Sequence, residues 1–282
     1  MNDELKREDY EEPRCVLCDP QTGRRYESRA LPMQRIVEKL DDYCDRRDYA
    51  GAERHLKYWL EEALFNGDLR GAFSMRNEMM GFYRKQGNRE AAFENAEAAL
   101  GLMKELQIED SAGGGTCLVN CGTVCDQFGM PEKALEYFER ARAVYEALPH
   151  PDSAKLGGLY NNMGLAHMDA GHFEEARGCF EKALTAMSCV GGGEPEAAIT
   201  YLNMADCAAL ERGIDGAQQE IDGYVKRAME LLDTPGLNRN GYYGFVCGRC
   251  APGFYCYGYP EYGAELEERA EKICQEAENE GT

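Results

Sequence analysis

The 282-residue chain carries 31 Lys and Arg against 51 Asp and Glu, which gives a net charge of −20 at neutral pH. Such a charge repels phosphate backbones, so DNA and RNA are excluded as expected partners, and the surplus acid keeps a long exposed surface in solution. Residues 1–13 contain no apolar stretch of a signal sequence, and no apolar run is long enough to cross a bilayer. We therefore expect a cytoplasmic protein that does not contact a membrane.

The first part of the chain, residues 1–30, shows no helical period and is expected to form an irregular N-terminal arm. It contains Cys15 and Cys18, followed by the turn signals Asp19-Pro20 and Thr22-Gly23. The apolar periodicity of helices begins only after this arm.

Beyond the arm, apolar residues recur at the 3.6-residue period of amphipathic helices, in pairs of helices separated by turns. The clearest pair lies between Tyr160 and Ala183. Its pattern also occurs 42 residues upstream, at Gly122 and Gly164, Gly129 and Gly171, Ala134 and Ala176, Phe138 and Phe180, and Ala141 and Ala183. A fixed period of helix-turn-helix units predicts a solenoid, in which each unit buries its apolar face against its neighbours.

Counting these units divides the chain into the arm, about five repeats in residues 31–237, and a degenerate sixth repeat with a capping helix in residues 238–282. The third repeat is expected to begin after Gly113-Gly114-Gly115. In the sixth repeat, Pro252-Gly253 is expected to interrupt the helix. The last helix, from about Glu261 to Ala277, is rich in glutamate and has the polar outer face that a terminal cap needs.

These positions resemble the tetratricopeptide repeat, and the 42-residue spacing resembles the long-helix type found in kinesin light chains and in bacterial peptide-sensing regulators. The whole chain is also similar to a group of clostridial repeat proteins. The resemblance implies an all-α fold, a right-handed α-α superhelix (solenoid) of about six helix-turn-helix repeats. It also implies a non-enzymatic scaffold whose first helices line a concave groove that holds a peptide or protein segment.

Asn120, Asn162 and Asn203 immediately precede the Cys-Gly, Met-Gly and Met-Ala pairs of repeats three, four and five, and by analogy with the family they face the groove. A carboxamide offers one acceptor and two donors, so a column of three can bind both the N–H and the C=O groups of an extended peptide. The alternative is that these side chains bond only to the adjacent helix. Glu38 and Glu78 take the same slot in repeats one and two.

The groove positions that flank this column differ between repeats, which is where specificity is expected. They are Ser74, Asn77, Arg84 and Lys85 in repeat two, Thr123, Asp126 and Gln127 in repeat three, and Asn161, Leu165 and Met168 in repeat four. Arg84 and Lys85 have two interpretations: they bind an acidic group of a ligand, or they are cations favoured by the dipole at the end of a helix.

The 13 cysteines include two CxxC pairs, Cys15 with Cys18 and Cys247 with Cys250. Four thiolates in two such pairs make a closed tetrahedral zinc site. Against this, the whole repeat array separates the pairs, and Cys247 and Cys250 fall on one expected helix, where both can pack as small apolar residues. We expect no cofactor, with zinc as the alternative.

Three functions remain in competition. The leading one is an adaptor that binds a protein or peptide in its groove, in one variant stabilised by zinc. The second is a regulator whose superhelix closes on a peptide signal. An enzyme is disfavoured, since no Ser-His-Asp set, phosphate loop or paired-carboxylate motif is evident. The sequence leaves the partner and the oligomeric state open.

Overall fold

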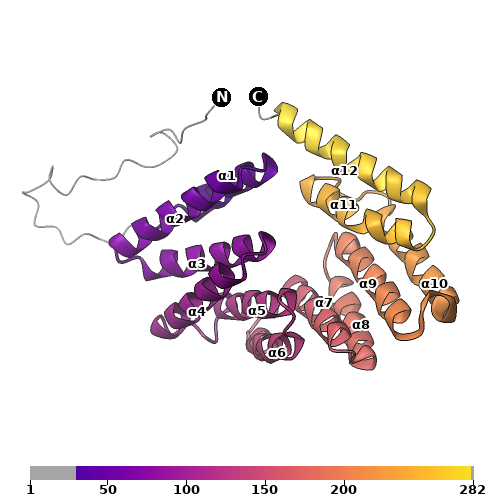
Figure 1. Cartoon of the computed structure of the whole chain (residues 1–282), viewed down its shortest axis with the longest axis horizontal. Coiled ribbons are helices and arrows are strands. Elements are labelled where there is room, and N and C mark those ends of the chain that lie inside the picture. The colour runs from indigo at the N-terminus through magenta and orange to yellow at the C-terminus, as the bar shows by residue number, and fades with distance from the viewer. Residues whose placement is uncertain (1–29, 281–282) are drawn as a thin grey trace, which may run out of the picture. The chain divides into compact units, whose positions relative to one another are not determined.

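The computed structural model describes residues 30–280, which form twelve α-helices and no strand (Figure 1). In chain order these are α1 (Met33–Asp45), α2 (Tyr49–Phe65), α3 (Leu69–Lys85), α4 (Arg89–Glu105), α5 (Ala112–Gln127), α6 (Pro131–Ala147), α7 (Ser153–Asp169), α8 (Phe173–Met187), α9 (Glu194–Arg212), α10 (Ile214–Leu232), α11 (Gly241–Cys256) and α12 (Pro260–Glu280). Six helix pairs follow one another, so the predicted all-α helical repeat is confirmed. None of the described helices combines the length and the hydropathy that a membrane crossing requires.

The chain divides at Ala72 into two compact units, and each is described by itself. Unit 1 contains α1, α2 and the start of α3, and Ile36, Leu56 and Trp59 are among its buried side chains. Unit 2 contains the rest of α3 and all later helices. The predicted N-terminal arm lies outside the described residues, apart from Ala30.

The turns that precede α2, α3 and α4 share one design, which our sequence analysis missed. Each places a residue at positive φ and follows it with a capping side chain that accepts a backbone N–H of the next helix. The pairs are Arg47 (φ 57) with Asp48, Gly67 (φ 68) with Asp68, and Gly87 (φ 68) with Asn88. Asp and Asn are preferred caps because their side-chain oxygens satisfy an otherwise unpaired N–H of the first turn. The connection from α2 to α3 is therefore as tight as the turns within a repeat.

In unit 2 the helices form two rows. In Figure 1, α5, α7, α9 and α11 lie on the inner side of an arc, and α6, α8, α10 and α12 on the outer side. Within each pair the two helices pack along each other, and α6 and α8 also pack on the first helix of the next pair. We call the inner side of α3 (from Phe73), α5, α7, α9 and α11 the inner face.

Two glycines allow the close approach within repeats three and four that the sequence predicts. A Cβ atom at Gly122 would lie 2.3 Å from Cε1 of Phe138, and one at Gly164 would lie 2.3 Å from Cε1 of Phe180. Both phenylalanine side chains are fully buried. Each ring therefore fills the space that the missing side chain leaves, and this contact holds the first helix of the repeat against the second.

The expectation that Gly113-Gly114-Gly115 precedes the helix is wrong, because α5 begins at Ala112 and includes all three. Ser111 caps α5 by accepting the N–H of Gly114 at 3.0 Å. A Cβ at Gly115 would lie 2.4 Å from the ring of Tyr145 on α6. Gly115 therefore allows a close contact between α5 and α6, and this packing outweighs the low helix propensity of glycine.

The expected break at Pro252-Gly253 is also absent, since α11 runs without interruption through Pro252. Ala251 and Phe254, on either side of this pair, are fully buried. Their burial holds the helix together where local propensity alone predicts its end.

Candidate functional site

The inner face carries a row of side-chain amides in two hydrogen-bonded pairs. Asn120 of α5 donates through Nδ2 to Oδ1 of Asn77 on α3, at 3.2 Å. Asn203 of α9 donates in the same way to Oδ1 of Asn161 on α7, at 3.0 Å, and the hydroxyl of Thr200 lies 3.2 Å from that oxygen. The amides of neighbouring repeats are thus held in fixed orientations.

The row overlaps the column of asparagines that the sequence predicts, but it is not identical to it. Asn77, rather than Glu78, meets Asn120 in repeat two. In repeat four Asn161 supplies the amide, whereas Asn162 is half-buried beside it. Neighbouring residues of an α-helix point about 100° apart, so a shift of one position decides which amide enters the row.

The two pairs leave part of the hydrogen-bonding capacity of the row unused. A carboxamide has one oxygen and two N–H donors. The bonds within the row use an N–H of Asn120 and the oxygen of Asn161, so the Asn120 oxygen and the Asn161 N–H groups remain for a ligand. Asn203, which the family resemblance places facing the groove, is only 8% exposed. Its amide also joins repeats four and five.

Three acidic side chains lie further along the same helices. Burial and the charge of Asp169 on α7 raise the pKa of Asp126 on α5 to about 6. The Oδ1 atom of Asp126 is buried and has no hydrogen-bond partner among the described residues. On α9, burial raises the pKa of Asp206, although this carboxylate accepts a hydrogen bond from the Tyr257 hydroxyl at 2.5 Å. The middle of the inner face therefore holds acid groups that a ligand cation would favour in their ionised form.

The charge of Arg249 on α11 acts on Arg84 of α3. Burial, and then the charge of Arg249, lower the pKa of the half-buried Arg84. Lys85 is exposed beside it, in the last turn of α3, where a cation is favoured by the helix dipole. No local pattern of the sequence relates these two helices.

The other predicted groove residues make contacts of their own. Thr123 donates to the carbonyl of Asn120 on its own helix at 2.8 Å, and Gln127 is exposed. Leu165 and Met168 are partly buried against a cluster that contains Phe180. These two apolar side chains contribute to the packing of repeats four and five.

Cys247 and Cys250 are fully buried in the apolar cluster shared by α9, α10, α11 and α12. Burial raises the pKa of both thiols, that of Cys250 to about 12. Zinc binds the thiolate, so this environment favours packing over ligation. Cys15 and Cys18 lie outside the described residues, and the described part contains no group of three or more His, Cys, Asp or Glu that could hold a metal ion.

We expect elemental mass spectrometry of the purified chain to show far less than one equivalent of zinc. We also expect Cys15→Ser to leave the midpoint of thermal unfolding unchanged. The exposed Cys189 provides the matched control, Cys189→Ser. About one equivalent of zinc that only Cys15→Ser releases would establish the zinc-stabilised form instead.

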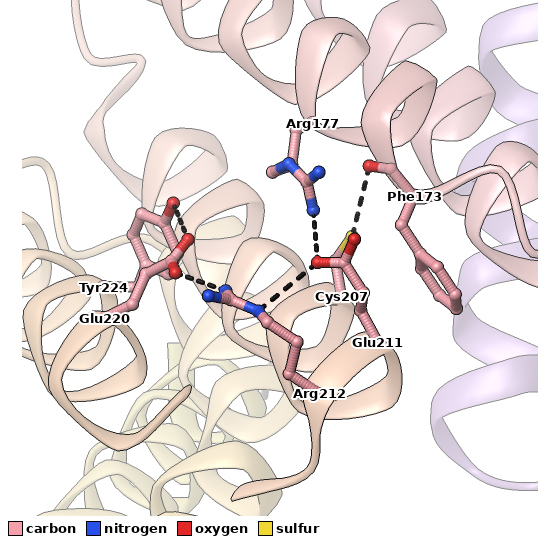
Figure 2. A network of polar contacts seen from close by, with 7 residues as sticks. All are labelled: Phe173, Arg177, Cys207, Glu211, Arg212, Glu220 and Tyr224. Carbon is pink, nitrogen blue, oxygen red and sulfur yellow. Dashed lines mark hydrogen bonds and ion pairs between the residues drawn. The ribbon is translucent and has the colours of Figure 1, made fainter. Parts of the chain in front are cut away.

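A chain of ion pairs connects α8, α9 and α10, and our sequence analysis missed it (Figure 2). Glu211 accepts from Arg177 at 2.6 Å and lies 3.4 Å from Nε of Arg212, which in turn pairs with Glu220. The hydroxyl of Tyr224 donates to Glu220 at 2.9 Å. Alternating charges at these helix ends are the signal that could have revealed the network, which joins repeats four and five.

The chain is similar to known proteins in both sequence and fold. Residues 72–147 and 158–188 match family models of the tetratricopeptide repeat. The protein kinesin light chain-related 1 of Arabidopsis thaliana is 31% identical over 84 residues, which make up 30% of this chain and 13% of that protein. The match thus spans a small part of that relative.

Two solved structures have a similar fold. BtubC (BKLC) from P. vanneervenii superposes with a TM-score of 0.61 and 21% identity, over 73% of this chain and 83% of that one. A Rap protein complexed with competence and sporulation factor superposes with a TM-score of 0.52 and 16% identity, over 84% of this chain and 73% of that one. At these identities the similarity concerns the fold.

Proposed function

We propose, from the premise that this chain contains tetratricopeptide repeats of the kinesin-light-chain-like type, that it is a cytoplasmic, non-enzymatic scaffold. Such repeats form protein-interaction scaffolds, and we place the bound segment, in extended conformation, along the inner face of unit 2. The observation that carries the proposal is the amide row, with its pairs Asn77–Asn120 and Asn161–Asn203.

The spacing of the row suits an extended backbone. Packed helices lie roughly 8–10 Å apart. An extended strand rises about 3.3 Å per residue, so about three residues of a ligand separate the contacts made by adjacent repeats. The free oxygen of Asn120 accepts a ligand N–H, and the free N–H groups of Asn161 bind a ligand C=O. Main-chain contacts of this kind hold a segment without reading its side chains.

A peptide-responsive regulator is the second candidate. It is favoured by the likeness to the Rap protein, whose structure contains competence and sporulation factor. Affinity purification of the chain from a cell lysate, followed by mass spectrometry, separates the two candidates. A recurrent protein supports the scaffold, and a recurrent short peptide supports the regulator.

We expect the double change Asn120→Ala with Asn161→Ala to weaken binding of the recovered segment about 30-fold. Each amide contact contributes about 1 kcal/mol once exchange with water is included. Fluorescence anisotropy with the labelled segment measures the affinity, and thermal unfolding of each variant separates loss of binding from loss of fold.

The neighbouring residue gives the matched control. Asn162→Ala removes the same kind of side chain at the adjacent position, and we expect it to change the affinity for the segment less than threefold. A loss with Asn162→Ala and none with Asn161→Ala would restore the column predicted from the sequence. Native affinity in the double variant would contradict the amide row as the binding surface.

A further inference from the structure

Three positions recur in the first helix of repeats three, four and five, and their side chains are buried in every case. They lie 17, 13 and 10 residues before the first buried alanine of the second helix. We call them the leading positions. Their residues are Cys117, Cys121 and Val124 on α5, Leu159, Met163 and Ala166 on α7, and Thr200, Met204 and Cys207 on α9.

The leading positions pack on the repeat that comes before them in the chain. The thiol of Cys121 on α5 lies 3.9 Å from Sδ of Met80 on α3. On α9, Met204 and Cys207 belong to one apolar cluster with Phe180 of α8. A preceding helix pair therefore covers this face of each of these repeats.

Repeat one carries charged side chains at the same positions. Arg35, Lys39 and Asp42 of α1 lie 17, 13 and 10 residues before Ala52, the first buried alanine of α2. Arg35 and Asp42 are exposed, and Nζ of the half-buried Lys39 lies 3.7 Å from Oδ2 of Asp42. Polar residues suit an end of the array that no further repeat covers.

This charged face is nevertheless hollow. A pocket of about 330 Å³ opens in unit 1, and the three leading side chains of α1 line it together with Ile36, His55 and Trp59. These last three residues are buried, and Nε2 of His55 lies 3.0 Å from the carbonyl oxygen of Ile36. We call it the end pocket. Buried apolar surface with charged residues around it suits an apolar side chain flanked by polar ones.

The arm, residues 1–29, directly precedes the end pocket in the chain. The N–H of Leu31 donates to Oδ2 of Asp68 at 3.0 Å, which fixes the backbone where the arm joins unit 1. The next residue, Pro32, lines the pocket. The arm is therefore attached at the pocket itself.

One stretch of the arm has the composition that the end pocket requires. Apolar residues are adjacent in residues 1–29 only at Cys15-Val16-Leu17-Cys18. The chain from Leu17 to Pro32 spans about 50 Å when extended, which is ample for a return to the pocket. A tether of this length also keeps the stretch at an effective concentration in the millimolar range.

We propose that Val16 and Leu17 dock in the end pocket, so that the arm covers the face of repeat one that a preceding repeat covers elsewhere. The arm then serves as the N-terminal cap of the array. This contact belongs to unit 1 and does not depend on the proposed function of the inner face of unit 2.

The charges on the two sides are compatible with this docking. Glu12 and Arg14 precede the apolar pair in the arm, and Arg35 and Asp42 lie at the pocket, so each side offers both signs. Exposed ion pairs contribute little to stability. The docking is therefore expected to depend on burial of Val16 and Leu17 rather than on any one charge.

Trp59 provides a direct test, because it lines the end pocket and is the single tryptophan of the chain. Acrylamide quenching of its fluorescence measures how far solvent reaches the pocket. Val16→Ser with Leu17→Ser removes most of the apolar surface of the docked pair, which lowers the docking constant by more than about tenfold. We therefore expect the quenching constant of the full chain to rise about twofold.

The matched control removes two apolar residues elsewhere in the arm. Leu5→Ser with Tyr10→Ser should leave the quenching constant at the wild-type value. A synthetic peptide of residues 12–21, added at millimolar concentration to the Val16→Ser, Leu17→Ser chain, should restore the protection of Trp59. The same peptide with serine at both positions should not. Restoration also shows that the variant has kept its pocket and its fold.

Three results would overturn the proposal. The first is equal quenching of the wild-type chain and the Val16→Ser, Leu17→Ser chain. The second is an equal rise in the Leu5→Ser, Tyr10→Ser control, which would remove the specificity for the apolar pair. The third is protection of Trp59 that is lost when the wild-type chain is diluted, because the occupant would then be a second copy of the chain.

Discussion

Replacement of Gly164 by alanine is expected to lower the free energy of unfolding by about 2 kcal/mol. The new Cβ would lie 2.3 Å from the ring of Phe180, which is fully buried on α8. Overpacking a filled core forces side chains away from their rotamers and shifts the backbone. Denaturant unfolding followed by circular dichroism measures the change.

A second glycine serves as the control. Gly178, within α8, has no atom within 4 Å of its ideal Cβ position. Gly178→Ala is therefore expected to raise stability by about 0.5–1 kcal/mol, because alanine narrows the unfolded ensemble and favours the helix. Adding Phe180→Leu to Gly164→Ala should recover part of the loss, since it removes ring atoms at the contact. Equal stability of the Gly164 and Gly178 variants would contradict the close contact.

Asp126→Asn is expected to stabilise the protein at pH 7 by about 1–2 kcal/mol, after allowance for the partial exposure of this side chain. The folded pKa of Asp126, about 6, lies above its ordinary value of 3.8. Between these pH values the folded state keeps a proton that the unfolded chain has lost. The stability that this carboxyl contributes is therefore fully present below about pH 4 and is lost as the pH rises through 6.

The gain from Asp126→Asn should vanish below about pH 4, where the wild-type carboxyl is protonated in both states. Denaturant unfolding at a series of pH values measures this profile. Burial raises the pKa of Asp126 more than the charge of Asp169 does. Asp169→Asn removes only the smaller of these two causes, so we expect it to give less than half of the stability gained with Asp126→Asn. A gain from Asp126→Asn that is constant between pH 4 and 8 would show that ionisation is not its origin.

Charged side chains are arranged differently on the inner face and between α8, α9 and α10. Between those helices, Glu211 and Glu220 alternate with arginines in an attractive network (Figure 2). On the inner face, the like charge of Asp169 acts on Asp126. Like-charged pairs cost stability, and such costs are concentrated where a protein binds ligands. The contrast supports the inner face as the binding surface.

The sequence by itself determined the helical repeat. The period of 42 that relates Gly122 with Phe138 to Gly164 with Phe180 is confirmed as a contact repeated in successive helix pairs. This was predictable because each repeat packs mainly on its chain neighbours, so local periodicity contains most of the information about the fold.

Only the tertiary structure decided which side chains meet between repeats. Whether Asn161 or Asn162 enters the amide row depends on a helix rotation of about 100°, which packing sets and repeat spacing does not resolve. The continuity of α11 through Pro252 likewise depends on buried neighbours rather than on local propensity. The electrostatic effect of Arg249 on Arg84 depends on how small rotations between repeats accumulate along unit 2, and no single repeat of the sequence encodes that sum.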